Sequence, residues 1–498
     1  MIISLYPPRA DERNTVKPLL RIITAWTLVW AGALVRDGAS STRAAEPAGS
    51  RVDVAPAVDA VADLWTRPGE DWGAFLGPTG NGRSGLTGIA SPWPAGGPRI
   101  VWHCELGDGY CAPAVARGRC VVCDRVGAEF RVRCLEAETG RPLWERRAPS
   151  SYVDTFGYDG GPRAQAVIDG DLVVTYSAEG RLACRQLVDG RELWQVDTAA
   201  DYHVVRNFFG VAAAPVMVEA DGRRLVIVQV GGSPPGSAPA APERLDLVRG
   251  LDSGLVAFDV LSGAERWRSS DELASYSTPV VARLAGEELL LAWMRDRFLV
   301  VEPATGRVRA GRRYRADELF SVVAASPVVS GDEVLLSETY GPGSLLLSLA
   351  GGRLDVVRED AGRGRPRDSL RAHWATPVLH EGHLYGSSGR NAGDAVLVCA
   401  DWKSGAIRWS ERGLGRASVV VADGHLIVLG EFGDLVLARA TPERFEPLSR
   451  ARLVDAGAGD LLAPPCWAAP VIAHGYLFVR GQGRLVCVDL LADRPGAP

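Results

Sequence analysis

Lysine is almost absent from this 498-residue sequence, which contains only Lys17 and Lys403, so nearly all of its positive charge comes from arginine. We attribute this bias to genomic base composition and not to phosphate binding. The net charge of −5 argues against a nucleic-acid-binding protein, which would normally present a basic face. With 47% hydrophobic residues the chain is not disordered over most of its length, which allows several ordinary domains or one large domain built from repeats.

Long apolar runs are also missing, with one exception near the amino terminus. Residues 22–35 (IITAWTLVWAGALV) are apolar and uncharged, follow a basic segment and precede small residues. The run is shorter than the roughly 20 residues of a membrane span and fits a signal peptide cleaved near Ala44, with an uncleaved inner-membrane anchor as the alternative. We therefore expect residues 1–45 to be a signal peptide or anchor, residues 46–70 to be a flexible tether, and the remaining chain to be exported to the periplasm or cell envelope.

One sequence pattern recurs about every 40 residues through the rest of the chain. The pattern is a small residue followed by Pro-Val, a turn with Gly, an apolar strand, a short loop, a second apolar strand ending in Asp or Glu, a Thr/Ser-Gly turn and a strand with Trp. The copies begin at Tyr110, Gln165, Ala214, Thr278, Ser326, Thr376, Ser418 and Ala469. Short apolar runs separated by glycine turns predict four β-strands per copy, which is typical of a β-propeller blade.

The number of copies predicts how the ring closes. Seven copies are complete, whereas the last ends after its third strand, and a strand with the missing Trp precedes the first copy at residues 98–102. Pairing these two pieces would leave no open sheet edge. We therefore predict an all-β protein: an eight-bladed β-propeller of four-stranded antiparallel blades over residues 71–490, closed by the N-terminal strand joining the last blade. Residues 491–498 would form a tail.

The repeated tryptophans are expected to be structural. An indole on the outer strand can lie across the Thr/Ser-Gly turn of the neighbouring blade, where glycine tolerates a left-handed backbone. Four of the seven complete copies have this tryptophan, at Trp144, Trp194, Trp267 and Trp409, and the copies near Arg309, Val356 and Pro447 lack it.

Two sequence features carry a family resemblance. Residues 135–144 and 399–409 resemble the repeat of quinoprotein-type propellers, with the pattern Ala-x-Asp-x-x-Thr-Gly-x-x-x-Trp. Residues 71–82 (DWGAFLGPTGNG) are similar to the Trp-x-x-Phe-Arg-Gly-Pro opening of exported bacterial PQQ-binding-like β-propeller repeat proteins, with Leu76 where Arg is usual. The resemblance covers residues 71–490. WD40 repeats match less well, because no copy has Gly-His before a strand or Trp-Asp after one.

The resemblance implies two classes of function, and the shared repeat does not choose between them. Quinoprotein dehydrogenases oxidise alcohols or sugars with pyrroloquinoline quinone (PQQ) and Ca²⁺, whereas other members are periplasmic scaffolds, such as the propeller lipoprotein of the outer-membrane β-barrel assembly machinery. The enzymes require an adjacent Cys-Cys pair, which this sequence lacks, and a Ca²⁺ site for which only Asn391 and Asp394 are candidates.

We therefore expect a non-catalytic scaffold that binds a protein or peptide partner on one face and uses no metal or cofactor.

 We expect the protein to be a monomer and to bind no nucleic acid. The alternative function is that of a PQQ-dependent dehydrogenase, which would use Ca²⁺ and act on alcohols or sugars.

The cysteines and histidines are assigned to packing, with one exception. His380 and His383 flank a hairpin turn and are not expected to bind a metal, and Cys120 and Cys123 lie on one strand with no second pair to complete a zinc site. Four cysteines share one repeat position, where a small buried residue is expected: Cys134, Cys184, Cys399 and Cys487. Cys111 and Cys466 begin the inner strands of the first and last blades, so a disulfide between them is a candidate in an oxidising compartment.

One face of the ring is predicted to bind the partner. Aromatic residues recur where inner strands begin, and the least repeat-like loops follow the second strands, so both sets would surround one mouth of the central channel. The alternatives are that these residues only form turns and fill the channel, or that the aromatics bind carbohydrate. The predicted partner-binding residues are Tyr110, Tyr276, Glu338, Tyr340, Trp374, Arg390, Asn391 and Trp467.

Overall fold

The computed structural model describes residues 58–154, 156–241, 243–360, 365 and 368–492. The predicted signal peptide or anchor therefore lies outside the described residues, as do residues 46–57 of the predicted tether and residues 493–498 of the predicted tail. Within the described part, no helix is both long enough and apolar enough to cross a membrane.

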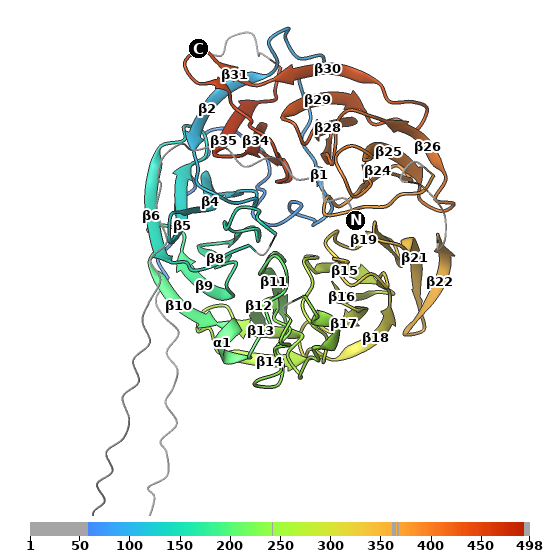
Figure 1. The fold of residues 1–498 in the computed structure, drawn as a ribbon. Coiled ribbons are helices and arrows are strands. Elements are labelled where there is room, and N and C mark those ends of the chain that lie inside the picture. The colour runs from blue at the N-terminus through green and yellow to red at the C-terminus, as the bar shows by residue number, and fades with distance from the viewer. Residues whose placement is uncertain (1–57, 155, 242, 361–364, 366–367, 493–498) are drawn as a thin grey trace, which may run out of the picture. The chain divides into compact units, whose positions relative to one another are not determined.

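Eight sheets are arranged around a central axis, each with four antiparallel strands and one with a short fifth strand added in parallel, which confirms the predicted eight-bladed β-propeller (Figure 1). Blade 1 consists, from the inner to the outer strand, of β3 (Ala114–Ala116), β4 (Arg119–Val126), β5 (Glu129–Glu136) and β6 (Pro142–Pro149). Blade 2 consists of β7 (Val167–Asp169), β8 (Leu172–Tyr176), β9 (Arg181–Gln186) and β10 (Glu192–Asp197). Blade 3 consists of β11 (Val216–Ala220), β12 (Arg223–Gln229), β13 (Leu255–Asp259) and β14 (Glu265–Ser269).

The next four blades repeat this order. Blade 4 consists of β15 (Val280–Leu284), β16 (Glu287–Trp293), β17 (Arg297–Val301) and β18 (Val308–Arg313). Blade 5 consists of β19 (Val328–Ser330), β20 (Glu333–Glu338), β21 (Gly343–Ala350) and β22 (Arg353–Glu359). Blade 6 consists of β23 (Val378–His380), β24 (His383–Ser388), β25 (Val396–Asp401) and β26 (Ile407–Glu411). Blade 7 consists of β27 (Ser418–Ala422), β28 (His425–Leu429), β29 (Asp434–Arg439) and β30 (Pro447–Arg452).

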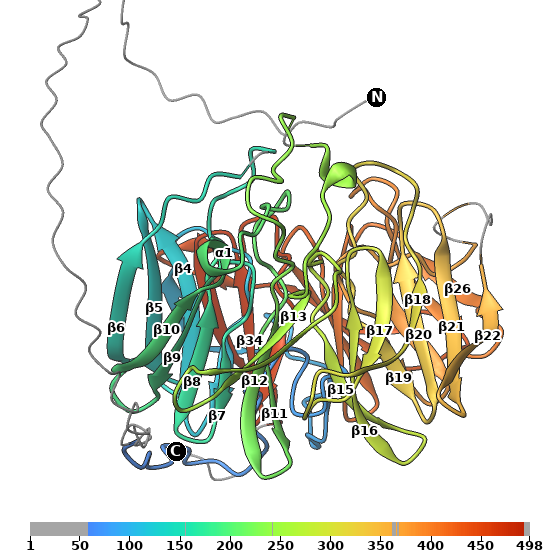
Figure 2. The same ribbon diagram turned by 90° about the horizontal axis from the view of Figure 1, so that it is seen from below.

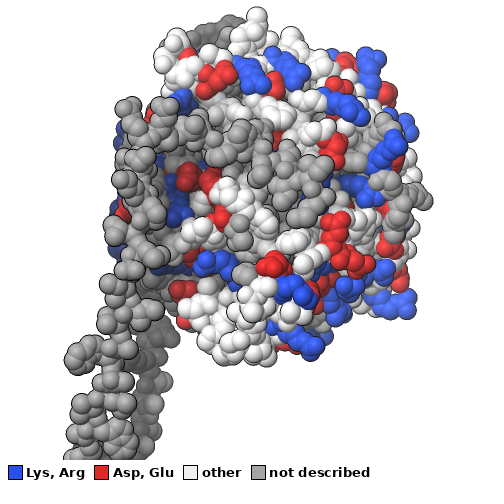
Figure 3. Space-filling model, in the orientation of Figure 1, with Lys and Arg blue, Asp and Glu red and all other residues white. Residues whose placement is uncertain are grey.

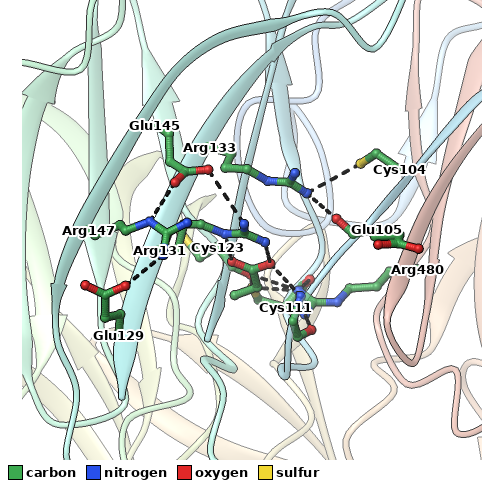
Figure 4. A network of polar contacts seen from close by, with 12 residues as sticks. Cys104, Glu105, Cys111, Cys123, Glu129, Arg131, Arg133, Glu145, Arg147 and Arg480 are labelled. Carbon is green, nitrogen blue, oxygen red and sulfur yellow. Dashed lines mark hydrogen bonds and ion pairs between the residues drawn. The ribbon is translucent and has the colours of Figure 1, made fainter. Parts of the chain in front are cut away.

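Blade 8 closes the ring in the predicted way. It joins β33 (Val471–Ala473), β34 (Tyr476–Gly481) and β35 (Arg484–Asp489) to β2 (Arg99–Glu105), which pairs antiparallel with β35. Arg480 adds a second link, because its buried Nη1 atom donates hydrogen bonds of 2.9 Å to the carbonyl oxygens of both Cys111 and Cys123 in the first blade (Figure 4). The remaining elements are short: β1 (Arg83–Ser84), β31 (Val454–Asp455), β32 (Gly459–Asp460), α1 (Thr198–Asp201) and the 3-10 helix η1 (Leu245–Leu247).

The repeated tryptophans connect neighbouring blades, as predicted. Each indole N–H donates a hydrogen bond of 2.8–2.9 Å to a carbonyl in the turn of the next blade; the tryptophans concerned are Trp102, Trp144, Trp194, Trp267 and Trp409. The turn glycine beneath the ring has a positive φ, and a Cβ atom there would clash with the indole; this holds for Gly140, Gly190, Gly263 and Gly306. These contacts fix the position of each blade relative to the next.

A small residue faces each of these tryptophans across the outer strand pair. Trp144 pairs with Cys134, Trp194 with Cys184, Trp409 with Cys399 and Trp102 with Cys487. All four cysteines are fully buried. Directly opposed side chains on neighbouring strands point to the same side of the sheet, so a small residue leaves room for the indole. The prediction that these cysteines act as small buried residues is confirmed.

The opening motif runs along the inner strands of several blades. Trp72, only 1% exposed, forms a bridge with Val115 in blade 1, the carbonyl of Gly73 accepts a hydrogen bond from Ile168 in blade 2, and β1 pairs parallel with β27 in blade 7. Figure 2 shows this N-terminal segment, in blue, on the opposite side of the propeller from α1. The motif is therefore part of the propeller core, a role that its resemblance to a family opening did not predict.

Candidate functional site

All eight predicted partner-binding residues lie on one side of the propeller. They occupy, or directly precede, connections that follow the second or fourth strand of a blade, and antiparallel strands bring these connections to the same side (Figure 2). We call this side the loop face and the opposite side, formed by the hairpin turns, the turn face. Lys/Arg and Asp/Glu side chains are interspersed over the propeller surface in view in Figure 3.

Four of the predicted residues form a row of aromatic contacts. The ring centroids of Tyr110 and Trp467 are 4.8 Å apart, as are those of Trp374 and Trp467. His373 extends the row, with centroid distances of 4.4 Å to Trp374 and 5.5 Å to Tyr340. These residues come from the connections of four different blades, so the fold brings together side chains that are far apart in the sequence.

Five further aromatics that sequence reasoning missed enlarge this row. Tyr158 lies 5.5 Å from Trp467 and 5.8 Å from Phe209, and Phe209 lies 5.5 Å from Tyr276. Phe156, Phe208 and Phe320 pack against one another at centroid distances of 5.5–6.3 Å. We call the complete set the aromatic cluster: Tyr110, Phe156, Tyr158, Phe208, Phe209, Tyr276, Phe320, Tyr340, His373, Trp374 and Trp467.

Members of the aromatic cluster differ in their access to solvent. Phe156, Tyr158 and Phe320 are 42–45% exposed, and the adjacent Val153 is 76% exposed. Tyr276 is buried, and its hydroxyl accepts a hydrogen bond of 3.0 Å from the Phe209 amide. Of the predicted residues, Tyr276 therefore supports the cluster from beneath, whereas the exposed apolar surface comes mainly from residues outside the repeat.

Arginine side chains lie over several of these rings. The Arg390 guanidinium is 4.3 Å from the centroid of Tyr340, and the Arg416 guanidinium is 4.6 Å from that of Trp374. Arg416 donates to the buried carboxylate of Glu431, which also accepts a 3.0 Å hydrogen bond from the Trp467 indole. Burial acts to raise the pKa of Glu431, but these hydrogen bonds outweigh it and hold the pKa below its ordinary value. Glu431 thus fixes Arg416 by an ion pair and Trp467 by a hydrogen bond.

Glu338 is the predicted residue with the most unusual environment. Its side chain is only 2% exposed, Oε1 accepts a 3.0 Å hydrogen bond from the Tyr340 amide, and Oε2 has no hydrogen-bond partner among the described residues. Burial raises the pKa of Glu338 to about 7, even though backbone hydrogen bonds to the carboxylate oppose the shift. The carboxyl group therefore changes its charge near neutral pH.

The residues expected of a quinone and Ca²⁺ site do not form one here. The backbone N–H of Asn391 donates a 2.9 Å hydrogen bond to the Asp394 carboxylate, and both residues are exposed on a surface loop. The described residues contain no group of three His, Cys, Asp or Glu side chains placed to hold a metal ion. Together with the missing Cys-Cys pair, this donor set does not fit the PQQ and Ca²⁺ group of the dehydrogenases.

The predicted disulfide between Cys111 and Cys466 is absent from the structure, where both are free thiols. The Cys111 thiol donates to the carbonyl of Cys123 at 3.2 Å, and the Cys466 thiol donates to the carbonyl of Ala463 at 3.5 Å. Each thiol is therefore directed to a carbonyl of its own neighbourhood. Adjacent blades bring the two strand starts near each other, but sequence position alone does not fix the direction of the side chains.

The fold and the repeat define the chain as a PQQ-like β-propeller. The family model described as "Outer membrane protein assembly factor BamB" matches residues 93–234 and 128–411, and the chain belongs to this family.

Solved structures show the same fold at low sequence identity. BamB from Moraxella catarrhalis is 15% identical, with a TM-score of 0.53, and the match covers 80% of this chain and 99% of that protein. A europium-containing methanol dehydrogenase is 10% identical, with a TM-score of 0.61, and the match covers 82% of this chain and 89% of the enzyme. No curated protein matches the sequence. Because an assembly factor and a dehydrogenase share the fold, the fold alone does not assign the function.

Proposed function

We propose that this protein is a non-catalytic, exported scaffold that binds a protein or peptide partner on its loop face. The observation that carries this proposal is the aromatic cluster, in which exposed Phe156, Tyr158 and Phe320 adjoin arginines stacked on neighbouring rings. Aromatic residues and arginine are the residues enriched in the cores of protein interfaces, and contiguous exposed apolar surface marks interaction sites.

Family membership suggests the kind of partner. The family is described by a role in outer-membrane protein assembly. We propose that the protein acts in the periplasm as a monomer, held near a membrane by residues 22–35 if these are not cleaved, with a protein of the envelope assembly pathway as its partner.

The proposal can be tested by crosslinking in cells. A photoreactive amino acid would replace Phe156 or Phe320 on the loop face, and Val188, which is 36% exposed in a hairpin turn of the turn face, would be the matched control position. We expect one discrete crosslinked protein, identified by mass spectrometry, from the two loop-face positions and none from Val188. Equal crosslinking from all three positions, or none from any, would contradict the proposal.

The dehydrogenase alternative makes a different prediction. It requires saturable binding of PQQ that depends on Ca²⁺, measured by calorimetric titration of the purified protein. The scaffold proposal expects no binding, because the donor set described above does not fit the cofactor. Micromolar PQQ binding would favour the enzyme instead.

A further inference from the structure

A cavity of about 210 Å³ lies beside the aromatic cluster, where connections of blades 2, 3 and 4 meet on the loop face. Part of its wall is the segment that also carries Phe208 and Phe209 of the cluster. Apolar side chains supply much of the lining, including Val204, Val211 and Leu245. The volume equals that of about seven water molecules at roughly 30 Å³ each, which is enough for a small organic molecule.

Polar groups of the cavity wall are mostly satisfied by the protein. Gln229 donates to the carbonyl of Ser277 at 2.7 Å and accepts from the Ser275 amide at 2.7 Å. Tyr176 shares a 2.7 Å hydrogen bond with Thr198. These groups rigidify the wall and leave little polar capacity for a ligand.

Arg295 is the exception among the lining residues. It is 6% exposed, its Nη1 donates to the Leu245 carbonyl at 2.7 Å, and its Nη2 has no hydrogen-bond partner among the described residues. The two carboxylates that influence it are engaged elsewhere, because Asp296 pairs with Arg315 and Asp246 pairs with Arg244.

Burial, followed by the positive charge of Arg315, lowers the pKa of Arg295 to about 10. A buried cation without a counter-ion is costly, and such a charge is normally paired.

A second arginine lines the same cavity. Arg206 is exposed and forms no ion pair with a described carboxylate; its guanidinium lies 5.6 Å from the centroid of Tyr152. The one lining carboxylate, Glu179, is already held by the Ser150 hydroxyl and the Tyr152 amide, and these hydrogen bonds keep its pKa below the ordinary value although burial opposes them. The cavity therefore combines two arginines with apolar walls.

We propose that this cavity binds a small organic carboxylate, with its acid group on Arg295 and Arg206 and its apolar body against the valine and leucine side chains. Guanidinium matches a carboxylate through two parallel hydrogen bonds, and burial strengthens this interaction. The site goes beyond the proposed docking function, since it would take a small molecule or the carboxyl terminus of a peptide and does not require the exposed aromatics.

Calorimetric titration of the purified full chain with isovalerate and with its neutral analogue isovaleramide tests the proposal. The two probes have nearly the same shape, so a difference between them reports the carboxylate. We expect saturable binding of isovalerate and at least tenfold weaker binding of the amide. Equal affinity for the two probes, or no binding of either, would overturn the proposal.

Variants locate the binding site. Arg295→Met should abolish the preference for the acid without lowering the thermal midpoint of the free protein by much, because the variant removes an uncompensated buried charge. Arg206→Met should weaken the binding of isovalerate several-fold. This variant tests the same site if Arg295→Met fails to fold. The control is Arg249→Met, which removes an exposed charge from the β12–β13 connection that also carries Leu245, but not from the cavity wall. Acid binding that survives both cavity substitutions, or falls equally in the control, would refute the site.

A peptide arm identifies the source of the carboxylate. The tripeptide Gly-Gly-Val would be compared with its C-terminally amidated form. Tighter binding of the free-acid peptide than of isovalerate indicates a peptide carboxyl terminus, and weaker binding indicates a free small acid; either result supports the carboxylate site. Binding of the amidated peptide equal to that of the free acid would contradict it.

Discussion

The contact between a tryptophan and the turn glycine of the next blade can be tested with two substitutions in one blade. Gly263→Ala and Gly222→Ala both place a methyl group on a turn glycine of blade 3, with φ of +71° and +69°. At Gly263 the new Cβ would lie 2.6 Å from an atom of the Trp194 indole, whereas at Gly222 no atom lies within 4 Å. The two variants therefore share the same backbone strain and differ in the tryptophan contact.

The expected magnitudes follow from these geometries. A left-handed backbone costs an alanine about 1–2 kcal/mol, so Gly222→Ala should lower the free energy of unfolding by about that amount. Gly263→Ala must also displace the indole of Trp194, which is 9% exposed and donates a 2.8 Å hydrogen bond to the Val260 carbonyl. Losing that bond costs about 1 kcal/mol, and losing part of the packing adds a comparable amount. We therefore expect Gly263→Ala to be about 2–3 kcal/mol more destabilising than Gly222→Ala.

Urea unfolding followed by circular dichroism measures the difference, and native-state hydrogen exchange of the β13–β14 turn localises it. A double-mutant cycle provides the control. Trp194→Ala alone should cost about 3–5 kcal/mol, and in that background Gly263→Ala should cost no more than Gly222→Ala does. The reasoning would be refuted if the two glycine variants were equally stable, or if the effect of Gly263→Ala were unchanged without Trp194.

Three further predictions concern buried groups. Arg480→Met should lower the free energy of unfolding by about 3 kcal/mol, because it leaves two buried carbonyls at the ring closure without a donor. Urea unfolding measures this change, and a smaller decrease than that of a surface arginine variant would contradict the role of Arg480. Glu338 has a folded-state pKa of about 7, above its ordinary 4.5, so its protonated form adds up to about 3 kcal/mol to the free energy of unfolding below pH 4.5. This contribution is lost as the pH rises through 7. The thermal midpoint of Glu338→Gln should not show this decline, and parallel pH profiles of the variant and the parent protein would disprove the prediction. Trp72→Ala should cost about 3–5 kcal/mol by urea unfolding if the opening motif belongs to the core, and an unchanged midpoint would argue against that.

The repeat made the fold of the molecule predictable from the sequence. Eight copies of one pattern carry the same information eight times, so the strands, the split blade and the Trp–glycine contacts could be inferred by comparing the copies. The cysteines opposite the tryptophans were predictable for the same reason, since one repeat position has one environment in every blade.

The candidate site was predictable only where it follows the repeat. Tyr110, Trp374 and Trp467 stand at a repeated position and do meet in the aromatic cluster. Phe156 and Phe209 lie in connections that no other copy resembles, so comparing copies gave no signal for them. The disulfide between Cys111 and Cys466, which are free thiols in the structure, stays a prediction, since the start of a strand locates a cysteine but does not fix the direction of its thiol.

The two sides of the propeller are under different physical constraints, and this difference favours a loop-face site. On the turn face, glycines such as Gly190 and Gly263 must remain glycine, because the indole of the preceding blade covers them. The opening motif adds a further constraint through Trp72, which is buried against blade 1. Connections on the loop face carry no such repeated contact and differ from blade to blade in length and sequence. Residues on the loop face can therefore change without loosening the ring, and the aromatic cluster and the arginine-lined cavity both lie there.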